Sequence, residues 1–210
     1  MNKLGDLSCK EILTELASAA PAPGGGGGAA MAGALAAALA SMVANLTIGK
    51  EKFAEREPEV KELLKQAEAE RVRLLQLADD DAAVFNSFMS CYKLPKTTDE
   101  EKAARTAAIR AAAKQAATVP LNIARSSFAV LKLADRLVVS GNPGVITDGA
   151  CSGLLARAAL RCAEYNVRIN LGLTKDEVWN AQAAADLKQL LADAKALETR
   201  LLAVTDKALQ

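Results

Sequence analysis

The chain has 210 residues, 51% of them apolar, and its 26 basic and 25 acidic residues nearly cancel. A substantial core is therefore available, while so balanced a charge excludes the strong field that nucleic acid or an acidic membrane surface requires, so we expect neither as a partner. Histidine is absent, which excludes Ser-His, Cys-His and histidine-metal chemistry, and we expect no metal site.

Composition also predicts the fold class. Alanine is abundant and aromatic residues make up only 3% of the chain, which favours helix over strand almost everywhere. The cysteines show no CxxC or ligand-like spacing, which argues against a zinc site and a disulfide framework; they are Cys9, Cys91, Cys151 and Cys162. We expect an all-α protein with a single domain over residues 1–210, located in the cytoplasm.

The first predicted helix is short, capped by Asp6 and ended before Pro21. The glycine run Gly24–Gly28 then opens directly into a second helix. Glycines there permit positive φ and close approach, and free N–H groups at a helix start suit a carboxylate or phosphate. On the glycines alone, we favour a helix start that serves only close packing. A nucleotide P-loop fits poorly because Gly-Lys-Ser/Thr does not follow.

The second helix contains twenty uncharged residues, 29–48, which meets the length criterion for a membrane span. We reject a span because alanine is only weakly hydrophobic, because Ser41, Asn45 and Thr47 lie within the segment, and because no second span follows. A core helix whose small residues let other helices approach closely explains the same pattern.

A long third helix is predicted from Pro58, a favourable first helical residue, to Tyr92. The segment Lys93–Lys96 breaks the apolar pattern, and Asp99 restarts it. Pro120 lies within the next apolar stretch and is expected to end one helix and open another.

The last third of the chain contains one clear turn, Ser140–Gly144, followed by a helix over about 147–170. Thr174–Glu177 matches the capping box that starts a last helix. Several of these helices are apolar on more than one face, which indicates burial against a second copy of the chain. We expect a bundle of long antiparallel helices that dimerises through apolar helix faces.

Three segments carry polar residues with more than one interpretation. Asp81 follows two other acids, and three adjacent acids usually form a solvated face. Asp148 falls in the opening turn of a helix, where an acid is commonly a cap. Asn166 and Asn170 are four residues apart on one helix face, where a buried hydrogen-bonded pair is the simpler explanation.

Five stretches occur along the chain in this order: PAPGGGGGAAMAGALAAALASMVANLTIGK, DAAVFNSFMSCYKLPK, ATVPLNIA, SGNPGVITD and NVRINL. In order and approximate spacing they resemble the formiminotransferase-cyclodeaminase C-terminal domain family, which includes stand-alone methenyltetrahydrofolate cyclohydrolases. The resemblance covers nearly the whole chain. One departure is that Gly27 and Gly28 stand where the family usually has serine and a small apolar residue.

The resemblance implies an all-helical homodimer acting on the one-carbon unit that bridges N5 and N10 of tetrahydrofolate, with or without a polyglutamate tail. We favour a cyclohydrolase, which hydrates 5,10-methenyltetrahydrofolate to 10-formyltetrahydrofolate, because the domain stands alone. The alternatives are a cyclodeaminase, which closes 5-formiminotetrahydrofolate with loss of ammonia, and a non-catalytic folate-binding or structural dimer. Either reaction needs only proton transfer and charge stabilisation, so no cofactor beyond the folate is expected.

Residues of this chain that match the family's motifs become site candidates. Asp148 is our first choice for the acid/base or cation-stabilising group, and Asp81 is the second. The substrate-binding candidates are Gly24, Gly25 and Gly26 as helix-start donors, Lys50, Lys93 and Lys96 for the glutamate-tail carboxylates, and Ser41, Asn45, Asn142, Asn166 and Asn170 for the pterin edge.

Overall fold

Helices are the only regular elements in the computed structural model, which describes residues 3–210. The all-α prediction is therefore confirmed. In chain order the elements are η1 (Leu4–Asp6), α1 (Cys9–Leu16), α2 (Gly24–Asn45), η2 (Glu51–Arg56), α3 (Glu57–Cys91), α4 (Asp99–Ser140), η3 (Pro143–Val145), α5 (Ile146–Thr174) and α6 (Glu177–Ala208).

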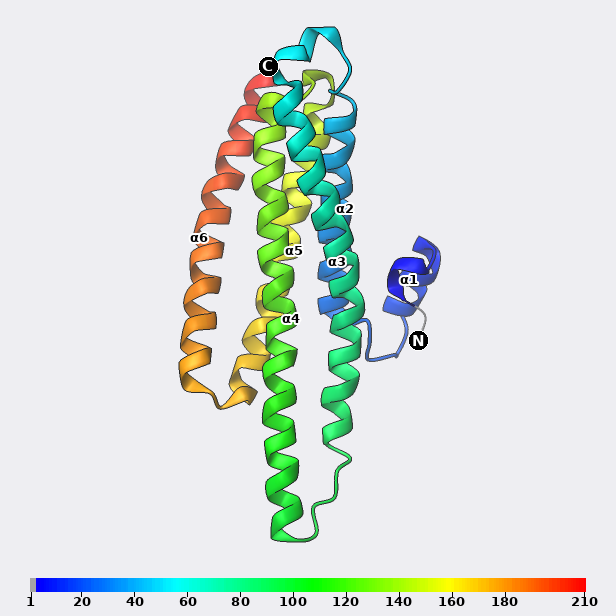
Figure 1. Cartoon of the computed structure of the whole chain (residues 1–210), viewed down its shortest axis with the longest axis vertical. Helices are drawn as coiled ribbons and strands as arrows, with labels where there is room; N and C mark the ends of the chain where they lie inside the picture. Colours follow the sequence, from blue (N-terminus) through cyan, green and yellow to red (C-terminus); the bar gives the residue numbers. More distant parts are fainter. Residues whose placement is uncertain (1–2) are drawn as a thin grey trace.

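Four helices form the central bundle: α2 packs against α3 and α5, and α4 packs against the same two helices (Figure 1). The sixth helix, α6, lies along α4 and α5, while the short α1 stands apart beside the N-terminal end of α2. Small side chains make the bundle tight. For example, Gly33 lies so close to Leu74 and Ser127 that a Cβ there would approach them within 3.2 Å.

The helix α2 has the length and the mean hydropathy, 1.7, of a membrane span, but 61% of its most apolar window is buried inside the protein. Its fully buried residues are mostly alanines, including Ala30, Ala36 and Ala37. The helix is thus packed as a core element against α3 and α5.

The predicted break at Pro120 is wrong, because α4 runs without interruption from Asp99 to Ser140. Proline lacks an N–H and so leaves the carbonyl four residues earlier, that of Ala116, without its helical donor. That carbonyl is not left unpaired, since Asn170 on α5 donates to it from Nδ2 at 2.8 Å. Pro120 is itself buried, so tertiary packing holds the helix together across the proline.

Two predicted helix starts are also wrong by two residues. Ser8, not Asp6, caps α1, and it forms a capping box with Glu11. At the other end of the chain Asp176 caps α6 by accepting from the Trp179 N–H, whereas Thr174 is the last residue of α5. Both segments contain two residues of capping type, and the sequence pattern alone does not choose between them.

The helices α3 and α4 are 35 and 42 residues long, about 53 and 63 Å at the helical rise. Their connected ends project beyond the rest of the bundle as a hairpin (Figure 1). Phe88 and Tyr92 stack edge-on at 5.3 Å near the end of α3, and Thr98 caps α4 through a capping box with Glu101. The start of α2 and the turn between α5 and α6 lie at the base of this hairpin.

Candidate functional site

A cavity of about 320 Å³ lies at the base of the hairpin. Three helices line it: α3, α4 and α5. The lining residues are Asp81, Val84, Phe85, Phe88, Ala116, Asn166, Ile169, Asn170 and Leu173. The first turn of α2 adjoins this group, since a Cβ at Gly25 would lie 3.7 Å from Nδ2 of Asn166.

The glycines at the start of α2 make room for one particular side chain. Gly24 has φ +56°, a left-handed conformation that favours glycine. Gly26 is buried against Asp81, and a Cβ there would overlap both oxygens of the Asp81 carboxylate. The Asp81 carboxylate thus occupies the position at this helix start that suits an anion.

Asp81 is the titratable group of this cavity. Burial raises the pKa of its carboxyl to about 6, although a hydrogen bond from the backbone N–H of Gly27 opposes the shift. A group with this pKa exchanges protons readily near neutral pH, which is what acid/base catalysis requires. Its neighbours Asp79 and Asp80 instead bond the Leu4 N–H and the Gln76 side chain.

Asn166 and Asn170 lie one helical turn apart and reach the same cavity from α5. Asn166 donates from Nδ2 to the Cys162 carbonyl at 2.9 Å. Asn170 donates from Nδ2 to two carbonyls, those of Ala116 and Asn166, each at 2.8 Å. The two asparagines thus bond backbone carbonyls and not each other's side chains.

The sequence prediction missed the apolar walls of this cavity. Phe85 and Phe88 follow Asp81 by four and seven residues, and Ile169 and Leu173 follow Asn166 by three and seven. These spacings place each apolar pair on the same helix face as its polar neighbour. The signal was in the sequence, but the same spacing also describes an ordinary core face.

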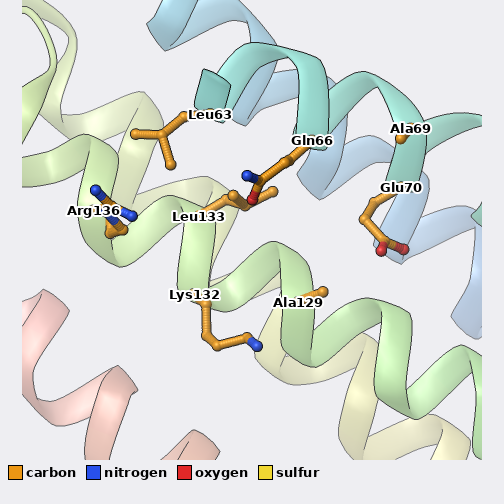
Figure 2. A pocket seen from close by; sticks show the side chains of 8 residues that line it. All are labelled: Leu63, Gln66, Ala69, Glu70, Ala129, Lys132, Leu133 and Arg136. Carbon is orange, nitrogen blue, oxygen red and sulfur yellow. The ribbon is translucent and has the colours of Figure 1, made fainter. Parts of the chain in front are cut away.

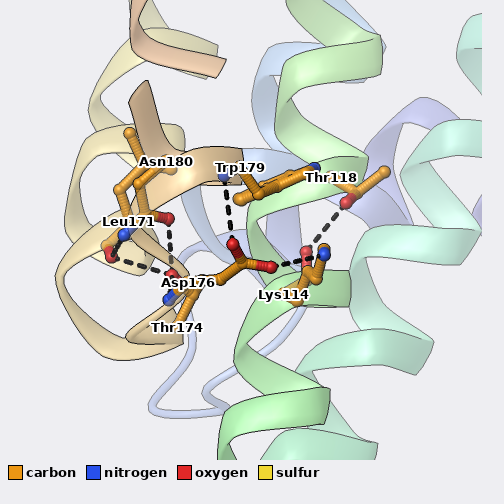
Figure 3. Close-up of polar contacts among 7 residues, drawn as sticks. All are labelled: Lys114, Thr118, Leu171, Thr174, Asp176, Trp179 and Asn180. Carbon is orange, nitrogen blue, oxygen red and sulfur yellow. Dashed lines mark hydrogen bonds and ion pairs between the residues drawn. The ribbon is translucent and has the colours of Figure 1, made fainter. Parts of the chain in front are cut away.

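The end of α5 that carries Asn170 is tied to α4 by a polar cluster (Figure 3). Lys114 on α4 pairs with Asp176 at 2.8 Å, and Asp176 also accepts from the Trp179 N–H at 3.0 Å. Asn180 accepts from the buried Thr174 hydroxyl at 2.5 Å and donates to the Leu171 carbonyl at 3.0 Å. These contacts hold the last turn of α5 beside the cavity.

A second hollow, of about 350 Å³, lies between α3 and α4 nearer the opposite end of the bundle (Figure 2). Two of its charged side chains, Glu70 and Arg136, already have polar partners. Glu70 accepts from the buried Ser126 hydroxyl at 2.5 Å, and Arg136 pairs with Glu59 at 2.5 Å. The Asp81 cavity, in contrast, contains a carboxyl whose pKa burial raises to about 6, so it is the better candidate site.

The remaining predicted residues lie elsewhere in the single chain. Asp148 is on α5, 18 residues and thus about 27 Å from Asn166. Asn142 bonds the Leu46 carbonyl and caps η3. The other placements are Ser41 buried within α2, Asn45 exposed at the end of α2, Lys50 exposed before η2, and Lys93 and Lys96 exposed between α3 and α4. One chain therefore brings together Gly24, Gly25, Gly26, Asp81, Asn166 and Asn170, and not the others.

Within residues 3–210 no three Asp, Glu or Cys side chains gather closely enough to hold a metal ion. The polar atoms that face the cavity are instead one carboxylate and two carboxamides. Such groups accept and donate hydrogen bonds, stabilise a cation and transfer a proton.

Residues 8–189 match the family model described as formiminotransferase-cyclodeaminase. A methenyltetrahydrofolate cyclohydrolase from Methylorubrum extorquens is 44% identical over 197 residues, which are 94% of this chain and 95% of that protein. A formimidoyltransferase-cyclodeaminase from Sus scrofa is 32% identical over 89% of this chain, which spans only 34% of that longer relative. The crystal structure of a formiminotetrahydrofolate cyclodeaminase from Thermotoga maritima superimposes with a TM-score of 0.88 at 29% identity, covering 98% of this chain and 99% of that one.

Proposed function

The chain belongs to the formiminotransferase-cyclodeaminase family, and we propose that it is a methenyltetrahydrofolate cyclohydrolase of one-carbon metabolism. The observation that carries this choice is the 44% identity, over nearly the full length of both chains, to a relative of that name. This chain spans about a third of the length of the mammalian relatives that are named for two activities.

The cavity supports chemistry on a cationic folate. The methenyl carbon of the substrate is part of an amidinium-like cation, which the Asp81 carboxylate stabilises and which the rings of Phe85 and Phe88 also favour. In our proposal water attacks that carbon and a water proton passes to Asp81. The C–N5 bond then breaks as the hydroxyl proton leaves and N5 takes up a proton. The sum is one water consumed, one proton released and 10-formyltetrahydrofolate formed.

A cyclodeaminase remains the second candidate, because the Thermotoga maritima structure with that name has the same fold. Purified protein added to methenyltetrahydrofolate is expected to accelerate the loss of its absorbance. Added to 5-formiminotetrahydrofolate, it is expected not to accelerate the formation of methenyltetrahydrofolate. Acceleration of the second reaction would instead establish a cyclodeaminase, and no effect on either would favour a non-catalytic protein.

We also propose a homodimer, formed through exposed apolar stripes on α2 and α5. The two helices pack side by side, and each exposes apolar residues at helical spacing. They are Leu35, Met42 and Leu46 on α2, and Cys151, Leu154, Ala158, Cys162, Tyr165 and Ile169 on α5. An exposed face of this extent is typical of an interface.

The proposed dimer also gives Asp148 a place in the site. Eighteen residues are five full helical turns, so Asp148 and Asn166 lie on one face of α5 at opposite ends of its stripe. A twofold axis across the middle of the stripes would bring Asp148 of the partner subunit to the cavity that holds Asp81. Lys50 and Asn45 lie at the same end as Asp148 and would approach with it.

Mixing two inactive variants tests this arrangement. Asp81→Asn and Asp148→Asn homodimers should each lose activity, and subunit exchange should restore about one quarter of the wild-type rate, because half the dimers are mixed and each contains one intact site. A mixture that stays inactive after exchange, with one variant ¹⁵N-labelled so that mass measurement proves that mixed dimers form, would place both acids of one site in the same subunit. An active Asp148→Asn homodimer would remove Asp148 from the site. A monomeric mass for the wild-type protein would refute the dimer.

We propose a cytoplasmic location. The four cysteines are free thiols, which is the state expected in a reducing cytoplasm. The reaction as written uses only proton transfer between water, Asp81 and folate, and we propose that it needs no cofactor. Full activity after treatment with a metal chelator would support the absence of a metal.

Lys93 and Lys96 remain candidates for the glutamate-tail carboxylates.

A further inference from the structure

The cavity wall contains a backbone carbonyl that its own helix does not use. In an uninterrupted α-helix the N–H of residue 120 would bond the carbonyl of Ala116, but Pro120 has no N–H. The Ala116 carbonyl accepts from Nδ2 of Asn170 at 2.8 Å instead. Pro120 on α4 and Asn170 on α5 are thus linked through this one carbonyl. Both Ala116 and Asn170 line the cavity.

This contact fixes the orientation of the Asn170 amide. Nδ2 carries two hydrogens, and both are used, one on the Ala116 carbonyl and one on the Asn166 carbonyl, each at 2.8 Å. The reversed amide would place Oδ1 against two carbonyl oxygens, which is repulsive. Oδ1 is therefore the polar atom of Asn170 that remains for a ligand in the cavity, and it is an acceptor only.

We propose that Pro120 is a positioning residue, which reserves the Ala116 carbonyl for Asn170 so that Asn170 presents Oδ1 to an N–H group of the bound ligand. The inference rests on the proposed function, because the edge of a reduced pterin carries N–H donors that match such an acceptor. Asn170 is the specificity-determining contact, and Pro120 acts through it.

The physical basis is competition for one acceptor. An alanine at position 120 restores a local N–H that is already aligned with the Ala116 carbonyl, and the Asn170 amide, held from another helix, then shares or loses that partner. One net hydrogen bond corresponds to about a threefold to tenfold change in a binding constant. The helix itself gains from the replacement, since proline is the least favourable interior residue.

Pro120→Ala therefore has an unusual expected signature. The melting temperature should stay the same or rise, while kcat/KM for methenyltetrahydrofolate falls about threefold to tenfold. Asn170→Ala should fall at least as far, and Pro120→Ala should have no further effect in the Asn170→Ala background. Pro58→Ala is the matched control, because Pro58 is exposed in the first turn of α3, away from the cavity; its kinetics should be unchanged.

The Asn170 side-chain amide provides a second readout that needs no turnover. In ¹⁵N spectra of the ligand-free protein its two Nδ2 protons should exchange slowly with solvent, and Pro120→Ala should make that exchange faster. Unchanged exchange would overturn the proposal, and so would Pro120→Ala kinetics equal to wild type or effects that add fully in the double variant. Should the wild-type protein act on neither folate, the proposed function fails, and the exchange measurement alone still decides whether Pro120 positions Asn170.

Discussion

Replacement of Asp81 by asparagine is expected to lower the turnover of methenyltetrahydrofolate by a factor of about 10² to 10⁴, the usual contribution of a positioned acid or base. The amide keeps the shape of the carboxyl group but neither takes a proton from water nor balances the substrate's charge. Steady-state kinetics beside direct measurement of folate binding would separate the two losses. Turnover within a few-fold of wild type would exclude Asp81 as the proton acceptor.

The pH dependence gives the same prediction an internal check. Burial raises the pKa of Asp81 to about 6, so the wild-type kcat/KM should rise with pH up to about 6 and then level off, as the base becomes ionised. The residual activity of Asp81→Asn should lack this limb. A profile that keeps its limb in the variant would assign the titration to another group.

Stability should respond in the opposite direction. A carboxyl whose pKa is higher in the folded protein than its ordinary 3.8 binds protons more tightly when folded, so its contribution to stability is present at low pH and is lost as pH rises from about 4 to 6. Above pH 6 the ionised carboxylate opposes folding, and its replacement by the neutral amide should leave the melting temperature equal or higher. An inactive but fully stable variant would rule out unfolding as the cause.

The second large effect is expected from a single methyl group at Gly26. A Cβ there would overlap both carboxylate oxygens of Asp81, so the carboxyl group must move away from the start of α2 and into the cavity that it lines. Gly26→Ala should therefore displace the carboxyl group, lower kcat/KM by about 10²-fold or more, and shift the pH limb away from about 6.

Gly28→Ala is the matched control two residues further along α2. A Cβ at Gly28 would meet only a Leu16 methyl group, at 3.9 Å, which is ordinary contact. Both substitutions favour the helix, since alanine replaces glycine, so a difference between them would measure the displaced carboxylate and not helix stability. Equal activity of the two variants would show that Asp81 tolerates a shift and that our account of the glycine run is wrong.

The helices were largely predictable, because alanine abundance and apolar periodicity act locally and agree along the chain. The unbroken α4 was not. The sequence shows that Pro120 lacks an N–H, but not that Asn170, fifty residues later, supplies a substitute donor to the Ala116 carbonyl. Local rules fail where a distant side chain completes the hydrogen bonding.

The candidate site was predictable only in part, for a related reason. The glycine run, Asp81 and the two asparagines could be named from the sequence, and they do lie together. Their ranking could not be derived, since the raised pKa of Asp81 depends on burial by other helices. Asp148 is our first choice from the sequence, yet in the single chain it lies about 27 Å from Asn166, and only in the proposed dimer would it reach this cavity.

The carboxylate of Asp81, which lies beside the start of α2, would make protons and cationic folate compete for the proposed site. In the proposed site both would bind the oxygens of Asp81, so binding of one would weaken binding of the other by the same factor, as thermodynamic reciprocity demands. When hydration removes the positive charge of the substrate, this competition ends and the proton affinity of the Asp81 carboxylate rises again. The protonation state of Asp81, whose pKa burial has raised, would thus change as the reaction converts a cationic substrate into a product without that charge.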